Sequence, residues 1–135
     1  MTEFRNSSSI APPVGAYSHA VRTSGPGQWL HIAGQIGVDK QGALASGVQA
    51  QADAAWSNLV AILEDAGMGV QDLVKITTYL LDSNDLAAVN AVRKQYLGEN
   101  RPAATLVVAK ALAKPEWLFE IEAVAFKGME PKNGS

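Results

Sequence analysis

The run from Leu118 to Phe126 constrains the fold of this chain more than any other feature, because it alternates with the period of a strand without producing a face suited to water. Side chains of a strand point alternately to its two faces. One face is wholly apolar and consists of Phe119, Ile121, Ala123 and Ala125. The other mixes carboxylates with apolar groups and consists of Leu118, Glu120, Glu122, Val124 and Phe126. Such a strand has to be covered by protein on both sides.

A helical pattern supplies cover for one of these sides. Between Ser46 and Gly67, apolar residues recur at the spacing of one helix face. They are Val48, Ala52, Ala55, Trp56, Leu59, Val60, Leu63 and Ala66. Ser46 and Gln49 have the spacing of a capping box, so we expect the helix to begin at Ser46. Gly67 is suited to the end of the helix.

A second helix is expected to begin with a cap at Ser83 or Asn84 and to run to about Tyr96. The strand-like runs are 14–23, 28–36, 73–81, 105–109 and 118–126. The order β-β-α-β-α-β-β indicates an α+β fold. Because strand-helix-strand crossovers are right-handed, both helices lie on one face of a single mixed sheet. We therefore infer that another subunit covers the opposite face.

Length and composition indicate one domain. The chain has 135 residues, of which 47% are apolar, and this suits a single domain over residues 1–135. We expect an ordered core at about 11–126. The polar first nine residues and the Gly-, Pro- and charge-rich stretch 127–135 are expected to be loose ends.

Charge and composition exclude several classes of function. The net charge is −2 and there is no basic stripe, so nucleic acid is not expected as a partner. The sequence has no cysteine, which excludes disulfides, thiolate nucleophiles and zinc–cysteine sites. No apolar run approaches the ~18–20 residues that span a membrane, and the first residues lack a secretory signal. A cytoplasmic location without membrane association is the expectation.

Two histidines, His19 and His31, fall in predicted strands and lack the spacing of metal ligands. A metal site needs about three protein ligands in fixed geometry. No metal is therefore expected, and both histidines are interpreted as ordinary polar residues. The sequence contains neither a GxSxG nucleophile elbow nor a glycine-rich phosphate loop.

Glu120 and Glu122 are more informative candidates for chemistry. Because they are two positions apart in one strand, their carboxylates share a face, with Cα atoms about 6.6 Å apart. Burial of a carboxylate is unfavourable unless the group is paired or functional. Salt bridges to Lys75 or Arg22, or exposure at a rim, would explain both structurally. This structural interpretation is favoured for Glu122, whereas for Glu120 both interpretations stay open.

Four stretches of the chain carry a family resemblance. They are PVGAYSHAV at 13–21, LHIAGQIGVD at 30–39, a helix-strand-helix pattern across 49–108 and LFEIEAVAF at 118–126. In this order they resemble the Rid family, also known as the YjgF family. The resemblance implies a chorismate-mutase-like fold and a homotrimer. Three sheets would then surround a central barrel, with helices outside and small-molecule clefts between subunits.

The resemblance also implies an activity and a site. Archetypal members hydrolyse reactive enamines and imines, such as 2-aminoacrylate, to a 2-keto acid and ammonia, and they need no cofactor. By this resemblance Tyr17 and Asn90 line the cleft, the backbone of Gly34 contacts the ligand, and Glu120 orients the attacking water. A carboxylate that accepts a proton from water beside an imine carbon is suited to general-base catalysis.

Three positions depart from the family pattern, each toward an apolar residue. Ala104 stands where imine deaminases have an arginine that grips the substrate carboxylate. Leu106 replaces the usual cysteine, and Ala33 replaces a serine. Arg101, three positions from Ala104 and before a proline, is not expected to substitute. Since loss of a desolvated charged contact weakens binding by about 2–5 kcal/mol, standard 2-imino acids are expected to bind poorly.

Two functions follow from the resemblance and its departures. The first is a cofactor-independent hydrolase that deaminates an enamine or imine other than a standard 2-imino acid, with Glu120 directing water. The alternative is a non-catalytic trimer that binds a small metabolite in the same clefts. Ribonuclease activity, reported for some members, is disfavoured by the acidic charge. A chorismate-directed activity rests on fold alone, and the carboxylates of chorismate need cations that this cleft lacks.

Overall fold

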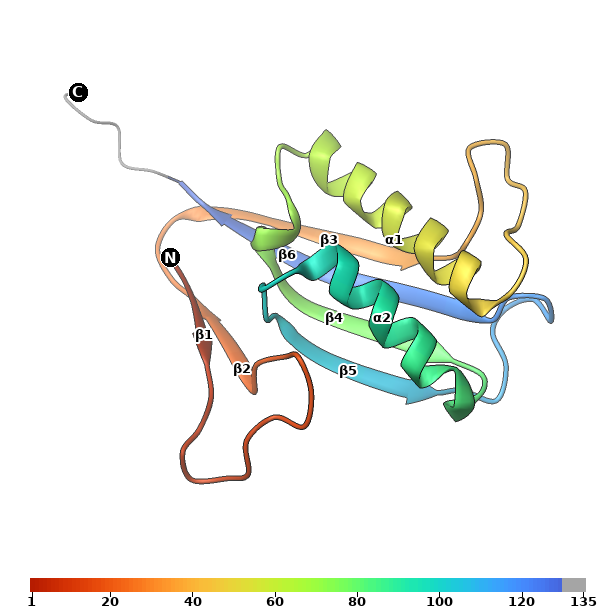
Figure 1. Ribbon diagram of the computed structural model, residues 1–135. Helices are drawn as coiled ribbons and strands as arrows, with labels where there is room; N and C mark the ends of the chain where they lie inside the picture. The colour runs from red at the N-terminus through yellow and green to blue at the C-terminus, as the bar shows by residue number, and fades with distance from the viewer. Residues whose placement is uncertain (130–135) are drawn as a thin grey trace.

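A four-stranded mixed sheet carries two helices on one face in the computed structural model, which describes residues 1–129 (Figure 1). The elements are β1 (Thr2–Arg5), β2 (Ala20–Thr23), β3 (Gly27–Gln35), α1 (Val48–Asp65), β4 (Leu73–Leu80), α2 (Leu86–Leu97), β5 (Ala103–Val108) and β6 (Phe119–Gly128). Single turns of 3-10 helix, Val70–Asp72 and Ser83–Asp85, precede β4 and α2. The loose end predicted at 127–135 is wrong for Lys127 and Gly128, which belong to β6 and pair with β3. The part at 130–135 lies outside the described residues.

The strand order in the sheet is β3-β6-β4-β5. β6 is antiparallel to both of its neighbours, β3 and β4. β4 and β5 are parallel, as a crossover through α2 requires. The predicted α+β fold, with both helices on one face of a mixed sheet, is confirmed. The expectation of a single sheet is wrong, because β2, from the predicted strand at 14–23, pairs with β1 in a separate two-stranded antiparallel sheet.

The apolar face of β6 lies at the centre of the core, as its alternation predicts. Phe119, Ile121 and Ala125 are fully buried. They lie under the apolar stripe of α1, whose most buried members are Ala52, Ala55, Trp56, Leu59 and Leu63. The indole of Trp56 stacks on the ring of Tyr96 in α2, with ring centroids 5.6 Å apart. This stack joins the two helices over the sheet.

No helix covers the other face of the sheet within residues 1–129, because both helices lie on the opposite side (Figure 1). Glu120, Glu122 and Val124 of β6 are half-buried there. Trp29 of β3 is 52% exposed, and Val107 of β5 is 38% exposed. The predicted mixture of polar and apolar groups is therefore present. Cover by another subunit stays a prediction.

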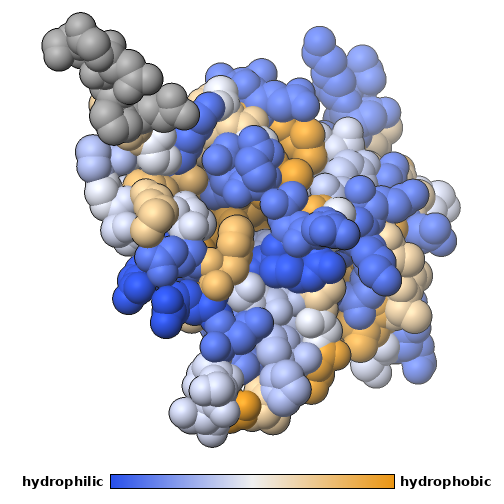
Figure 2. Space-filling view, turned by 60° about the vertical axis from the view of Figure 1, so that its left-hand side comes forward, coloured by the Kyte–Doolittle hydropathy of each residue, from blue (hydrophilic) through white to orange (hydrophobic). Residues whose placement is uncertain are grey.

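The expectation of a loose N-terminus is wrong for Thr2–Arg5, which form β1 and pair with β2. The predicted strand at 14–23 is reduced to Ala20–Thr23. The Glu3 carboxylate accepts hydrogen bonds from Arg22 and Arg5 at 3.0 and 3.2 Å, and the bond from Arg22 lowers the pKa of that carboxyl. Hydrophilic residues occupy much of the face shown in Figure 2, with hydrophobic residues between them. β1 itself has Phe4 as its one apolar residue, so hydrophobic periodicity gives no signal for this strand.

Both predicted helix caps differ from the structure. α1 begins at Val48 after Gly47, whose φ of 87° suits glycine, and no side chain caps it. The predicted cap at Ser46 is thus wrong. Before α2, the carboxylate of Asp82 accepts a hydrogen bond from the Asn84 backbone N–H at 2.9 Å. That contact caps the short 3-10 turn rather than α2 itself. Gly67 follows α1 with a φ of 72°, as predicted.

We expect Trp56→Ala to lower the free energy of unfolding by about 3–5 kcal/mol, because it removes a buried aromatic ring and leaves a cavity. The side chain is 1% exposed and stacks on Tyr96. Urea denaturation followed by circular dichroism measures the change. Trp29→Ala is the matched control, since Trp29 is 52% exposed. An equal loss in both variants would contradict the central place given to Trp56.

Candidate functional site

The residues proposed from the resemblance fall into two separate cavities. The Tyr17 cavity, of about 280 Å³, lies between the segment before β2, α2 and β5, and Tyr17, Asn90, Ala104 and Leu106 all line it. The Glu120 cavity, of about 430 Å³, lies on the open face of the sheet and is lined by Gly34, Glu120 and others. The two cavities share no lining residue. Ala33 is exposed and lines neither cavity.

A β-bulge in β3 brings Gly34 to Glu120. Ile32 pairs with Ala123 and Gln35 with Ile121, so two residues of β3 lie opposite the single residue between them in β6. Simple alternation places Gly34 on the same face as Ile32, and the bulge overturns that assignment. A Cβ added at Gly34 would collide with Oε2 of Glu120 and lie 2.8 Å from its Cδ. The carboxylate of Glu120 thus packs directly on the backbone of Gly34.

The two carboxylates of β6 have different surroundings. The hydroxyl of Tyr79 donates a hydrogen bond to Oε1 of Glu122, and this bond raises the pKa of Tyr79. Glu120 is half-buried, and its carboxylate has no hydrogen bond or ion pair with any of residues 1–129. Glu122 is therefore held by a neighbour, whereas the oxygens of Glu120 are available to a ligand or to water.

The salt bridges suggested for these carboxylates do not form within residues 1–129. Lys75 instead donates a hydrogen bond from Nζ to Oγ1 of Thr105 at 2.6 Å. Arg22 pairs with Glu3 at 3.0 Å, in the separate β1–β2 sheet. The structural interpretation of Glu122 thus holds through a different partner, the phenol of Tyr79.

Gln51 fixes the start of β6, and sequence reasoning missed it. Its side chain is 2% exposed. Its Oε1 accepts a hydrogen bond from the Leu118 backbone N–H at 2.8 Å, and its Nε2 donates to the carbonyls of Glu116 and Ala45, both at 3.2 Å. A buried amide that satisfies three backbone groups places the strand that carries Glu120. The available signal was an amide within the apolar stripe of α1.

Backbone contacts hold Tyr17 beside β5. The N–H of Ser18 donates to the carbonyl of Pro102 at 3.3 Å, and Ser18 forms an isolated parallel bridge with Ala103. The N–H of Tyr17 closes a turn onto the carbonyl of Gly15 at 3.0 Å. The segment before β2 therefore runs along the free edge of β5. This places Tyr17 and Ala104 in one cavity.

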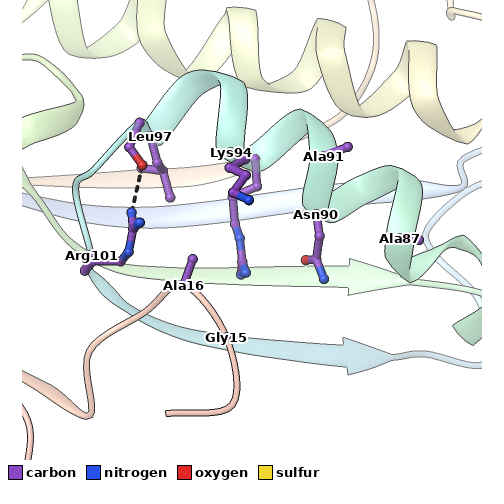
Figure 3. A pocket seen from close by; sticks show the side chains of 10 residues that line it. Gly15, Ala16, Ala87, Asn90, Ala91, Lys94, Leu97 and Arg101 are labelled. Carbon is purple, nitrogen blue, oxygen red and sulfur yellow. Dashed lines mark hydrogen bonds between the residues drawn. The ribbon is translucent and has the colours of Figure 1, made fainter.

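Arg93 of α2 is a further residue of the Tyr17 cavity that the sequence pattern did not indicate. It is half-buried. Burial, together with the positive charge of Arg101, lowers the pKa of its guanidinium. Arg101 itself donates to the carbonyls of Gly98 and Asn100 at 2.7 and 3.0 Å. Figure 3 shows Arg101 beside the C-terminal end of α2. It lines a neighbouring cavity and not the one that contains Ala104.

Within one chain, the Tyr17 cavity and the Glu120 carboxylate are separated by the sheet. Tyr79 pairs with Val107, so Tyr79 and Glu120 lie on the open face of the sheet. Leu106, the neighbour of Val107, packs against the core on the helix side. Ala104 and Leu106 of the Tyr17 cavity thus lie on the opposite face of the sheet from Tyr79 and Glu120.

Neither histidine belongs to either cavity. His19 accepts a hydrogen bond at Nδ1 from the Ser7 backbone N–H at 3.0 Å, and His31 is exposed on β3. Across residues 1–129, no three His, Asp or Glu side chains gather closely enough to bind a metal ion. No helix in this same part of the chain is both long and apolar enough to cross a membrane.

The fold, with two helices on one face of a mixed sheet, is shared with a known family. The family model described as Endoribonuclease L-PSP matches residues 8–127. A RutC family protein of Pyrococcus horikoshii is 43% identical over 117 residues, which cover 85% of this chain and 90% of that protein. The chain belongs to the Rid family, as the resemblance predicts.

Two further comparisons concern activity and structure. The human 2-iminobutanoate/2-iminopropanoate deaminase is 41% identical over 117 residues, covering 85% of this chain and 82% of that enzyme. The crystal structure of YyfB from Yersinia pestis, a Rid family protein of unknown function, has a TM-score of 0.83 at 35% identity. The match covers 92% of this chain and 97% of that chain.

We expect Gly34→Ala to displace the Glu120 carboxylate with little change in the free energy of unfolding, because the added methyl overlaps the far end of a flexible, half-buried side chain. Thermal denaturation and a crystal structure of the variant measure both effects. Gly128→Ala, also in a strand, is the control, because its added Cβ has only an ordinary contact at 3.5 Å. An unmoved Glu120 in Gly34→Ala would refute the close packing.

Proposed function

We propose that this protein is a cofactor-independent hydrolase that deaminates a reactive enamine or imine other than a standard 2-imino acid. The observation that carries this proposal is the half-buried carboxylate of Glu120, packed on Gly34 and without a partner in residues 1–129. The similarity to proteins named as 2-iminobutanoate/2-iminopropanoate deaminases supports the same class of reaction.

In the proposed reaction, Glu120 accepts a proton from a water molecule as the water oxygen bonds to the imine carbon. The electron pair of the C=N bond moves to nitrogen, which takes up a proton. The resulting carbinolamine then loses ammonia and becomes a carbonyl compound, so one imine and one water give one ketone and one ammonia. An enamine enters the same path once its β-carbon has gained a proton and its nitrogen has lost one, which gives the imine.

The lining of the Tyr17 cavity supports a substrate that differs from the standard 2-imino acids. Ala104 presents a methyl group where the family arginine would grip a carboxylate next to the imine carbon, and Leu106 adds apolar surface. A fork of N–H donors is therefore missing from this position of β5. A 2-imino acid placed there would lose its charged anchor.

We also propose that a homotrimer completes the site. The residues implied by the resemblance lie on opposite faces of one sheet, and no helix covers the open face within residues 1–129. A neighbouring subunit on the open face would bring its own Tyr17 cavity toward Glu120. Light scattering should then give three times the chain mass of 14.2 kDa.

We expect Glu120→Gln to lower kcat by about 10²–10⁴-fold, because an amide cannot accept the water proton. The assay is run in the Ala104→Arg background, in which 2-iminobutanoate regains an anchor for its carboxylate. It generates 2-iminobutanoate in situ with an amino-acid oxidase and follows competition between hydrolysis and trapping by semicarbazide. Glu64→Gln, an exposed change on α1, is the control and should retain the activity of that background. Full activity in Glu120→Gln would overturn the proposed role.

We expect Ala104→Arg to raise kcat/KM for 2-iminobutanoate by at least about tenfold, the effect of one charge-assisted contact. The same semicarbazide assay measures it. High activity of the unmodified protein, without a gain in Ala104→Arg, would show that standard 2-imino acids are substrates after all.

The alternative is a trimer that binds a small metabolite without converting it. The apolar residues Ala33, Ala104 and Leu106, at positions where the family has polar groups, favour it. A metabolite that binds to the protein and is recovered unchanged would support this alternative. Nucleic acid remains disfavoured as a partner by the net charge of −2.

A further inference from the structure

The guanidinium of Arg93 is a half-buried cation without a protein partner. The side chain of Arg93 forms no hydrogen bond or ion pair with any of residues 1–129. It projects from α2 into the Tyr17 cavity, where Tyr17 and Asn90 also line the wall. An arginine withdrawn from water normally gains a carboxylate or several carbonyl oxygens in return.

The surroundings of Arg93 add positive charge and supply no negative charge. The Tyr17 cavity and the neighbouring Arg101 cavity, of about 360 Å³, share Gly15, Asn90 and Arg93. The Arg101 cavity is lined in addition by Lys94 and Arg101, and no Asp or Glu lines either cavity. Figure 3 shows Asn90, Lys94 and Arg101 along this side of α2.

A bound anion would supply the partner that the Arg93 guanidinium lacks. Burial and the like charge of Arg101 both lower the pKa of Arg93, yet arginine stays protonated at neutral pH. A carboxylate can accept two parallel N–H bonds from a guanidinium. The Asn90 amide and the Tyr17 hydroxyl line the same space and can donate further hydrogen bonds.

We propose that Arg93 is the anion-binding residue of this cleft and that it holds a carboxylate on the side chain of the ligand. This assignment rests on the proposed function. It makes the substrate class an imine that carries a carboxylate at the far end of its side chain. Ala104 and Leu106 line only the Tyr17 cavity, whereas Arg93 stands at its border with the Arg101 cavity. A ligand that lies along Ala104 therefore reaches Arg93 with its far end.

Two ketones with five carbons test this assignment by binding alone. 2-Oxoglutarate ends in a carboxylate, whereas 2-oxopentanoate ends in a methyl group and is otherwise alike. Isothermal titration calorimetry on the full chain should show 2-oxoglutarate binding at least about tenfold more tightly, as expected for a charge-assisted hydrogen bond. Arg93→Gln should reduce this ratio to near one. Lys40→Gln removes the same positive charge from an exposed loop residue and should leave the affinity ratio unchanged.

A labelling experiment on the unmodified protein covers the case in which Arg93→Gln does not fold. Phenylglyoxal modifies accessible arginines, and mass spectrometry reports the extent at each site. 2-Oxoglutarate should slow the modification of Arg93 several-fold, while Arg5, exposed in β1, should react at an unchanged rate. 2-Oxopentanoate should protect Arg93 much less.

Failure of this inference is distinct from failure of the proposed hydrolase. Equal binding of the two ketones, or equal protection by them, overturns the role of Arg93 even if imines are hydrolysed. The role is equally overturned if Arg93→Gln changes only the oligomeric state, because Arg93 then pairs with another subunit. If 2-oxoglutarate binds tightly through Arg93 and no imine is turned over, the anion site is supported and the proposed hydrolase activity is contradicted.

Discussion

The packing of β6 between β3 and β4 is the constraint on which the rest of the structure depends. Its inner face supplies Phe119 and Ile121 to the core, and the same alternation turns Glu120 to the open face. A slip of one residue in register would bury Glu120 beneath α1 and expose Phe119. The burial of apolar surface therefore fixes the direction in which the free carboxylate points.

Two local devices refine that position. The bulge in β3 turns Gly34 toward Glu120, and because glycine has no side chain, the carboxyl group fits beside it. The amide of Gln51 satisfies the backbone on either side of Trp117, just before β6 begins. One device makes room for the carboxyl group, and the other holds the strand that carries it. Neither contributes a group to the proposed chemistry.

The sequence predicted those parts of the fold that follow from hydrophobic periodicity. The stripe of α1 around Trp56 and the buried face of β6 were both correct, because each places enough apolar surface in one repeat to determine burial. β1 was missed because its contacts are ion pairs around Glu3 in an exposed sheet. The cap at Ser46 was wrong because Gly47 itself adopts the conformation that starts α1.

For the site, sequence reasoning reached single residues but not their grouping. It singled out Glu120 from its place in an apolar strand, yet the face of Gly34 depends on a bulge that no period of two reveals. It noted the methyl group at Ala104 without seeing that Arg93, from a different element, lines the same cavity. Contacts between β5 and α2 depend on tertiary packing, which local pattern does not encode.

The division of the two cavities between opposite faces of one sheet has a consequence for divergence among relatives. Substitutions in α2 or β5 alter the walls around Tyr17, whereas Glu120 is supported by β3, β4 and the Gln51 amide. Changes in one group therefore do not disturb the packing that holds the other. Relatives with this architecture can therefore change the small molecule that they bind through substitutions in α2, while the carboxylate on the open face keeps its position.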